Sequence, residues 1–214
     1  MRLTFIRPAE LVCQIAKASG CHVIASAGTD EKVEFIKSLG VDSVFNYKTT
    51  DTAKALADFG KPIDIFWDGV GGATLDAWFG AAARGGRAIE CGMISAYNGG
   101  EVYKFRCVYI GPGLQIFTIG TDPFPACPSQ LSRNIMNMIG RGLNMRGFLV
   151  SEFESMADEF YAEVPKSLAN GTFKSAEEVR DGLASTPQAF SDMLSGLNKG
   201  KVVVKVADAG KSHL

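Results

Sequence analysis

Lys32 is the first residue whose type and position suggest a specific chemistry. An apolar strand expected over residues 22–27 runs into Gly28 and Thr29, and Lys32 lies one turn into the helix expected next. Where a dinucleotide site prefers NAD, an Asp or Glu at this point binds the ribose 2′-hydroxyl. A lysine instead suits a 2′-phosphate, which a carboxylate would repel. From residue types alone, a solvated helix lysine is the commoner alternative.

Two further segments rich in small residues follow apolar strands. "WDGVGG" (67–72) closes a strand expected over 63–68, and its glycines allow backbone to approach a ligand closely, although an ordinary turn is equally compatible. "CGMISAY" (91–97) closes a strand expected over 87–94. Because ligands of open parallel sheets bind at the carboxyl ends of the strands, both segments are candidate binding segments.

The turn after the first expected strand lacks the residues that a dinucleotide site needs. An apolar run over 3–6 is followed by Arg7-Pro8-Ala9-Glu10, without a glycine. In dinucleotide-binding units this turn carries glycines, which let backbone N–H groups reach a pyrophosphate at the helix N-terminus. Glu10 would stabilise that helix end but repel a pyrophosphate. We therefore expect cofactor binding to be weak.

Strand and helix patterns alternate along the chain, which predicts an α/β fold with a doubly wound, mainly parallel sheet. Strands are expected at 3–6, 22–27, 43–47, 63–68, 87–94 and 145–150, with a last strand at 201–206. Helices are expected near 11–16, 30–39, 50–59, 73–84, 130–141, 154–170 and 187–195. Residues 98–128 are rich in Gly, Pro and aromatics and are expected to form an atypical loop or insertion, with a possible hairpin.

Composition excludes several classes of partner. The net charge is −1 with scattered Lys and Arg, so neither a nucleic acid nor an anionic membrane surface is expected as a partner. No apolar run approaches the roughly 20 residues of a membrane span. The five cysteines lack C-x-x-C spacing and there are two histidines, which predicts reduced thiols, a cytoplasmic location and no metal site.

Four segments together resemble one enzyme family: "AGTDEKVEFIKSLGVDSVFNYK" (27–48), "CGMISAYN" (91–98), "MRGFLV" (145–150) and "GLNKGKVVVKV" (196–206). They are similar to the zinc-independent medium-chain dehydrogenase/reductases, in the prostaglandin reductase or alkenal/enone reductase branch. The resemblance spans most of the chain outside 1–10 and 98–128. It corresponds to the later, Rossmann portion of a family member, without the N-terminal barrel domain.

The resemblance implies a division of the chain. Residues 1–172 would be a dinucleotide-binding Rossmann domain. Residues 173–206 would be a closing segment, a remnant of what is normally the GroES-like catalytic barrel, and 207–214 a tail. The expected sheet has six strands, with the last helix and strand lying to one side. Because an isolated last strand leaves an open edge, a homodimer through that edge is plausible.

The resemblance also implies an NADP(H) site and a small enone or alkenal substrate. Tyr97 would act on the substrate carbonyl, by polarising it or supplying a proton, and Lys32 and Tyr47 would hold the 2′-phosphate. The implied cofactor residues are Lys32, Tyr47, Gly69, Cys91, Gly92, Met93, Ile94, Ser95, Tyr97, Phe148, Leu149, Val150 and Asn198. The family commonly has Asn where this chain has Gly69.

Several of these residues also have an ordinary structural interpretation. Tyr47 and Tyr97 would be strand-end or boundary aromatics, and Cys91 a small buried residue rather than a nucleophile. Residues 148–150 would be core strand, and Asn198 would serve a turn.

Two hypotheses follow from these observations. The first is an NADPH-dependent reductase of the C=C bond of α,β-unsaturated aldehydes and ketones, seen here as a shortened chain with little activity. The second is a non-catalytic Rossmann-like module for packing or self-association. A Rossmann methyltransferase fits less well, because it does not account for "CGMISAY" or "GKVVVKV".

Overall fold

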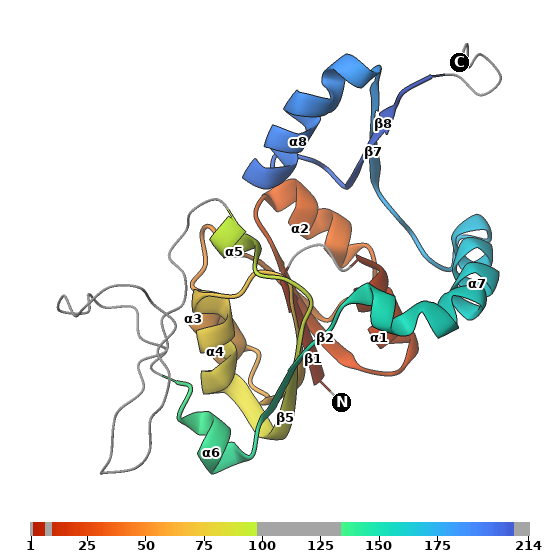
Figure 1. The fold of residues 1–214 in the computed structure, drawn as a ribbon. Coiled ribbons are helices and arrows are strands. Elements are labelled where there is room, and N and C mark those ends of the chain that lie inside the picture. The colour runs from red at the N-terminus through yellow and green to blue at the C-terminus, as the bar shows by residue number, and fades with distance from the viewer. Residues whose placement is uncertain (1, 7–9, 98–133, 208–214) are drawn as a thin grey trace, which may run out of the picture.

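The computed structural model describes residues 2–6, 10–97 and 134–207. Its main element is a six-stranded sheet of order β3-β2-β1-β4-β5-β6, in which every adjacent pair is parallel (Figure 1). The strands are β1 (Arg2–Ile6), β2 (His22–Ala27), β3 (Ser43–Asn46), β4 (Ile63–Asp68), β5 (Ala82–Glu90) and β6 (Asn144–Gly147). This is the strand order of a doubly wound Rossmann sheet, so the expected fold class is confirmed.

Helices cover both faces of the sheet, with α1 on one side and α3 and α4 on the other (Figure 1). The helices of this part are α1 (Glu10–Ala18), α2 (Asp30–Lys37), α3 (Thr52–Asp58), α4 (Ala73–Ala81), α5 (Ile94–Tyr97), α6 (Asn137–Arg141) and α7 (Ala157–Ala169). Side-chain oxygens of Thr29 and Asp51 accept backbone N–H bonds at the starts of α2 and α3. None of the described helices is long and apolar enough to cross a membrane.

Two hydrophobic clusters fix the helices to the sheet. On the side of α3 and α4, Phe66 of β4 stacks on Trp78 of α4 with ring centroids 5.6 Å apart, and both side chains are fully buried. On the side of α1, Cys13 and Ala16 pack against Val23 of β2. A sheet buried on both faces explains why its strands are apolar runs rather than alternating patterns.

Strands β5 and β6 end three or more residues earlier than the sequence predicts. β5 stops at Glu90 rather than residue 94, because its partner β4 ends at Asp68, and Cys91 N then donates to Asp68 O. β6 stops at Gly147, which pairs with Glu90, and residues 150–156 form a 3-10 helix instead. Residues 148–150 therefore follow the strand rather than belong to it. The expected loop at 98–128 and the start of the helix expected at 130 lie outside the described residues.

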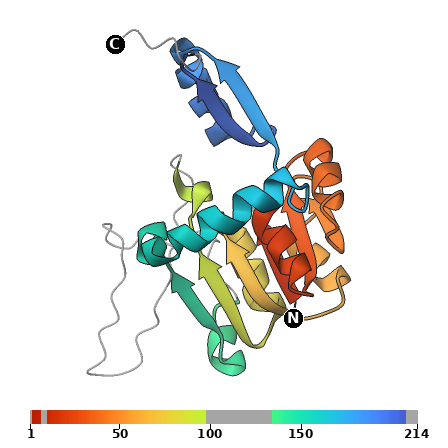
Figure 2. The same ribbon diagram turned by 90° about the vertical axis from the view of Figure 1, so that its right-hand side faces the viewer.

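A second, smaller unit lies to one side of the sheet (Figures 1 and 2). In it β7 (Glu177–Asp181) pairs in parallel with β8 (Lys201–Lys205), and the 3-10 turn Leu183–Ser185 and α8 (Thr186–Ser195) connect them. β7 was not predicted, because its sequence "EEVRD" has one apolar residue. The expectation of an isolated last strand is wrong, since β8 has β7 as a neighbour. The assignment of 173–206 to a barrel domain stays a prediction.

The segment that leads into β7 is attached to α1 through Gln14, a buried residue of that helix. Its Nε2 donates to Lys174 O at 2.8 Å, and its Oε1 accepts from Lys174 N at 2.7 Å. The amide side chain thus pairs with the backbone as a neighbouring strand would. Next to this attachment, Lys201 N donates to Ala176 O at 2.8 Å, which begins the pairing of β8 with β7.

We expect Gly200→Ala to destabilise the smaller unit. An added Cβ would lie 2.1 Å from the Ala176 carbonyl oxygen, so the backbone would have to move and the Lys201–Ala176 bond would be disturbed. The expected loss is about 1–3 kcal/mol of unfolding free energy, measured by urea denaturation. The control is Gly140→Ala in α6, where a Cβ meets nothing within 4 Å. Equal stability of the two variants would contradict this account of Gly200.

Candidate functional site

The carboxyl ends of β2, β4 and β5 border a cavity of about 530 Å³, called here the main cleft. The smaller unit contributes the opposite wall through Met193 and residues 198–200. Six predicted cofactor residues line it: Lys32, Gly69, Cys91, Gly92, Ile94 and Asn198. Four segments far apart in the sequence therefore meet at the carboxyl edge of the sheet. The strand order reverses at β1, which has β2 on one side and β4 on the other, and ligands of such sheets bind at this point of reversal.

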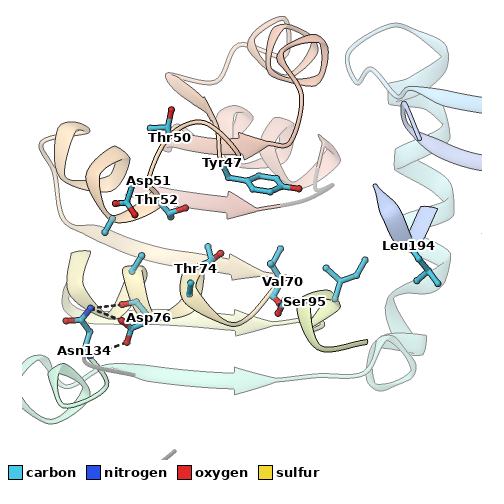
Figure 3. A pocket seen from close by; sticks show the side chains of 14 residues that line it. Tyr47, Thr50, Asp51, Thr52, Val70, Thr74, Asp76, Ser95, Asn134 and Leu194 are labelled. Atoms are coloured by element: carbon cyan, nitrogen blue, oxygen red, sulfur yellow. Dashed lines mark hydrogen bonds between the residues drawn. The ribbon is translucent and has the colours of Figure 1, made fainter. Parts of the chain in front are cut away.

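Other predicted residues lie around a second cavity of about 630 Å³, between α3 and α4 (Figure 3). Tyr47 and Ser95 line it, and Ile94 borders both spaces. The Tyr47 ring lies over Gly28, because a Cβ at Gly28 would sit 2.6 Å from Tyr47 Oη. Tyr47 thus stands between the two cavities. The rest of the second cavity is lined by apolar side chains, by hydroxyls and by the carboxylates of Asp51 and Asp76, and no lysine or arginine lines its described wall.

The remaining predicted residues lie beside these cavities rather than in their lining. Met93 packs on Gly71, where a Cβ would lie 3.1 Å from Met93 Cγ. The Phe148 ring makes an edge contact with Trp67, a residue of the main cleft, at 5.7 Å between centroids. Leu149 and Val150 are 70% and 83% exposed, so they are not core strand. Tyr97 ends α5, and its side chain lies outside the described residues.

Two predicted residues already make hydrogen bonds at the smaller unit, Lys32 from α2 and Asn198 from within the unit itself. Lys32 Nζ donates to Gly196 O at 2.7 Å, at the C-terminal end of α8, where a cation meets the negative end of the helix. Asn198 Nδ2 donates to Gly200 O at 2.6 Å, which is the turn role given above as its alternative. A nearby ion pair, Lys199 with Glu31 at 3.0 Å, also joins the unit to α2.

The main cleft fits a dinucleotide at its two ends but not at its middle. Gly69 and Gly92 have no side chain to block the strand ends, the Tyr47 hydroxyl lies against Gly28, and Lys32 supplies a cation at the β2 end. Glu10, the first residue of α1, also lines the cleft and places a carboxylate where a pyrophosphate would lie. The turn over residues 7–9 lies outside the described residues.

Comparison with known proteins decides the family. The family model described as "Zinc-binding dehydrogenase" matches residues 10–109. A zinc-type alcohol dehydrogenase-like protein of Schizosaccharomyces pombe is 36% identical over 201 residues, which are 93% of this chain and 50% of that protein. A 2-alkenal reductase (NADP(+)-dependent) of Nicotiana tabacum is 35% identical over 92% of this chain and 51% of its own length.

A solved structure supports the same family assignment. CurA from Vibrio vulnificus, in complex with NADPH, is 30% identical and matches 97% of this chain and 57% of its own, with a TM-score of 0.77. The chain belongs to the medium-chain dehydrogenase/reductases, in the branch of the prostaglandin and alkenal reductases. It spans about half the length of the curated relatives it matches. The resemblance read from the four segments is thereby confirmed.

Cys91 differs from its expected state in this dehydrogenase/reductase chain. It is exposed rather than buried, and its Sγ donates to Asp68 O at 2.9 Å. Partial burial of the thiol raises its pKa, so it stays a thiol near neutral pH and is a poor nucleophile. No group of three potential His, Cys, Asp or Glu metal ligands occurs in the described part of the chain. Zinc-independence stays a prediction.

A pair of buried carboxyl groups lies at the same sheet edge and was not predicted. Asp68 and Glu90 end β4 and β5 in register, and Asp68 Oδ1 accepts bonds from Val70 N and Gly71 N at 2.8 and 2.9 Å. Burial, together with the Asp68 charge, raises the pKa of Glu90 to about 8, and burial also raises that of Asp68. The pair therefore holds a proton at neutral pH. The signal in the sequence was an acidic residue closing each of two adjacent apolar strands.

We expect Glu90 to make the protein less stable as the pH rises. A carboxyl whose pKa is raised in the folded state contributes stability that is complete below pH 4.5 and is lost on approaching pH 8. Glu90→Gln cannot ionise at this position. At about pH 9 its free energy of unfolding should therefore exceed that of the parent by about 2 kcal/mol, a figure that is reduced for the partial exposure of Glu90. Urea denaturation between pH 5 and about 9 measures it.

The matched control is Glu159→Gln, which neutralises an exposed carboxylate of α7. Its stability difference from the parent should not change with pH. A pH-independent difference between the parent and Glu90→Gln would rule out the shared proton.

Proposed function

We propose that this chain is the cofactor-binding portion of an NADPH-dependent oxidoreductase that reduces the C=C bond of α,β-unsaturated aldehydes and ketones. The observation that carries the proposal is the convergence of Lys32, Gly69, the 91–94 segment and Asn198 on the main cleft. The relatives support it: they include a 2-alkenal reductase, a (+)-pulegone reductase of Mentha piperita and an NADPH-dependent curcumin reductase of Escherichia coli.

In this proposal Lys32 binds the 2′-phosphate of the cofactor, with Tyr47 beside it over Gly28. Lys32 then exchanges its bond to Gly196 O for a phosphate oxygen, which is the stronger, charge-assisted partner. The glycines at 69 and 92 allow backbone contact with the nicotinamide half. When bound, the cofactor supplies a hydride.

The substrate end of the proposal concerns Tyr97. Its hydroxyl would donate a hydrogen bond to the enone carbonyl, or a proton, while the hydride reaches the β-carbon. Residues 148–150 would lie beside the nicotinamide, and Trp67 and Phe148 provide an apolar wall that limits water near the reacting carbons. The proposed reaction uses no metal ion. Its test is formation of the saturated aldehyde from a 2-alkenal with loss of NADPH absorbance.

Glu10 favours a second candidate function, a Rossmann-like module that packs or self-associates without a nucleotide. A carboxylate lies at the N-terminus of α1, and Lys32 is engaged by the C-terminal end of α8. An NADPH titration followed by fluorescence separates the candidates, since only the first predicts saturable binding. Light scattering tests self-association, which the second requires.

We expect the chain to bind NADPH more tightly than NADH and Lys32→Glu to abolish that preference. A charge-assisted contact to the 2′-phosphate contributes roughly 1.5–3 kcal/mol, and a glutamate there repels the phosphate. Fluorescence titrations with both cofactors measure the ratio of Kd values. The control is Lys37→Glu, which makes the same change in the last turn of α2 at an exposed position. Equal affinity of the parent chain for the two cofactors would refute the role of Lys32.

A further inference from the structure

Glu10 occupies a position in the main cleft that the proposed function leaves unexplained. It begins α1, a helix of nine residues that follows the central strand β1, and it lines the cleft. The N-terminus of this helix is the positive end of its dipole, and in dinucleotide-binding sheets it faces the pyrophosphate. Here the chain's own carboxylate takes that place.

The smaller unit's approach segment holds this carboxylate where it is. Ser175 Oγ donates to Glu10 Oε1 at 2.7 Å. One turn along α1, the two bonds between Gln14 and the Lys174 backbone fix the neighbouring residue of the same segment. Gln14 Nε2 also donates to Glu10 O at 3.0 Å. Rotation of the Glu10 side chain away from the cleft would therefore break its hydrogen bond with Ser175, whose neighbour Lys174 is held by Gln14.

The charge of Glu10 is not cancelled by a described cation. Its side-chain partner is a neutral hydroxyl, and no ion pair involves Glu10 among residues 2–6, 10–97 and 134–207. The charge is felt inside the cleft: burial, with the negative charge of Glu10, raises the pKa of Cys13 to about 12. Cys13 lines the same cleft. A second anion entering beside Glu10 would meet this field directly.

We infer that Glu10 is a specificity-determining residue of the main cleft: it selects against ligands that place a phosphate at the start of α1. Ser175 keeps the carboxylate in position. The inference rests on the proposed function, because it assumes that NADPH enters this cleft with its 2′-phosphate at Lys32. It adds that the affinity for NADPH is limited by Glu10, whereas a nucleotide that carries its phosphate only at Lys32 is not affected.

The experiment compares two ligands by isothermal titration of the full 214-residue chain. NADPH carries the pyrophosphate, and adenosine 2′-monophosphate carries only the phosphate meant for Lys32. Glu10→Gln keeps an oxygen for Ser175 and removes the charge, so its Kd for NADPH should fall about tenfold while that for the monophosphate stays unchanged. Ser175→Ala frees the carboxylate and should lower the NADPH Kd by about threefold.

The matched control is Glu34→Gln, which removes one negative charge from the exposed side of α2 and should alter neither Kd. Thermal unfolding of each variant is compared with that of the parent. If Glu10→Gln fails to fold, Ser175→Ala provides the test, and an unchanged Kd of that variant for NADPH overturns the inference.

The possible outcomes separate the inference from the proposed function. If the parent and Glu10→Gln bind NADPH equally, the inference fails and the proposed function stands. If both ligands tighten equally in Glu10→Gln, the effect is a general change in field or structure, and the inference also fails. If neither ligand binds to any of the proteins, both the proposed function and the inference are wrong.

Discussion

The parallel pairing of β2, β1, β4 and β5 is the constraint on which the rest of the structure depends. Because these strands run in one direction, their carboxyl ends meet at one edge of the sheet, and every connecting segment that follows them opens there. The cleft, the Lys32 contact and the pair of Asp68 and Glu90 are all consequences of this common edge. Helices on both faces bury the sheet and leave this edge as the accessible place for chemistry.

Local patterns in the sequence were sufficient for the sheet and for half of the site. The apolar runs and the segments 67–72 and 91–97 identify strand ends, so the convergence of Gly69 and Gly92 follows from the fold class. The bonds from Ser175 to Glu10 and from Lys32 to Gly196 join residues 165 and 164 positions apart, and no periodicity reports such contacts. β7 escaped prediction for another reason: a two-stranded exposed sheet needs little apolar surface, so "EEVRD" lacks the usual signal.

The two cavities divide the predicted cofactor residues in a physically informative way. The main cleft has two lysines, Lys32 and Lys199, and the glycines in its lining, whereas hydroxyls, carboxylates and apolar side chains line the second cavity, with no lysine or arginine in its described wall. In the proposed function the 2′-phosphate would therefore bind on the main-cleft side of Tyr47, whose hydroxyl lies against Gly28. Within the main cleft, the positive charge of Lys32 attracts an anion at one end, and the negative charge of Glu10 repels an anion at the start of α1.

The bond from Lys32 to Gly196 has a thermodynamic consequence of its own. A ligand that draws the Lys32 ammonium away breaks this bond to the end of α8 and so weakens one attachment of the smaller unit, whereas the Lys199–Glu31 ion pair and the Gln14–Lys174 bonds remain. By reciprocity, a molecule that bound the end of α8 and broke the same bond would free the Lys32 ammonium for a ligand. This hydrogen bond, made to the backbone rather than to a side chain, thus connects ligand binding at Lys32 to one attachment of the smaller unit.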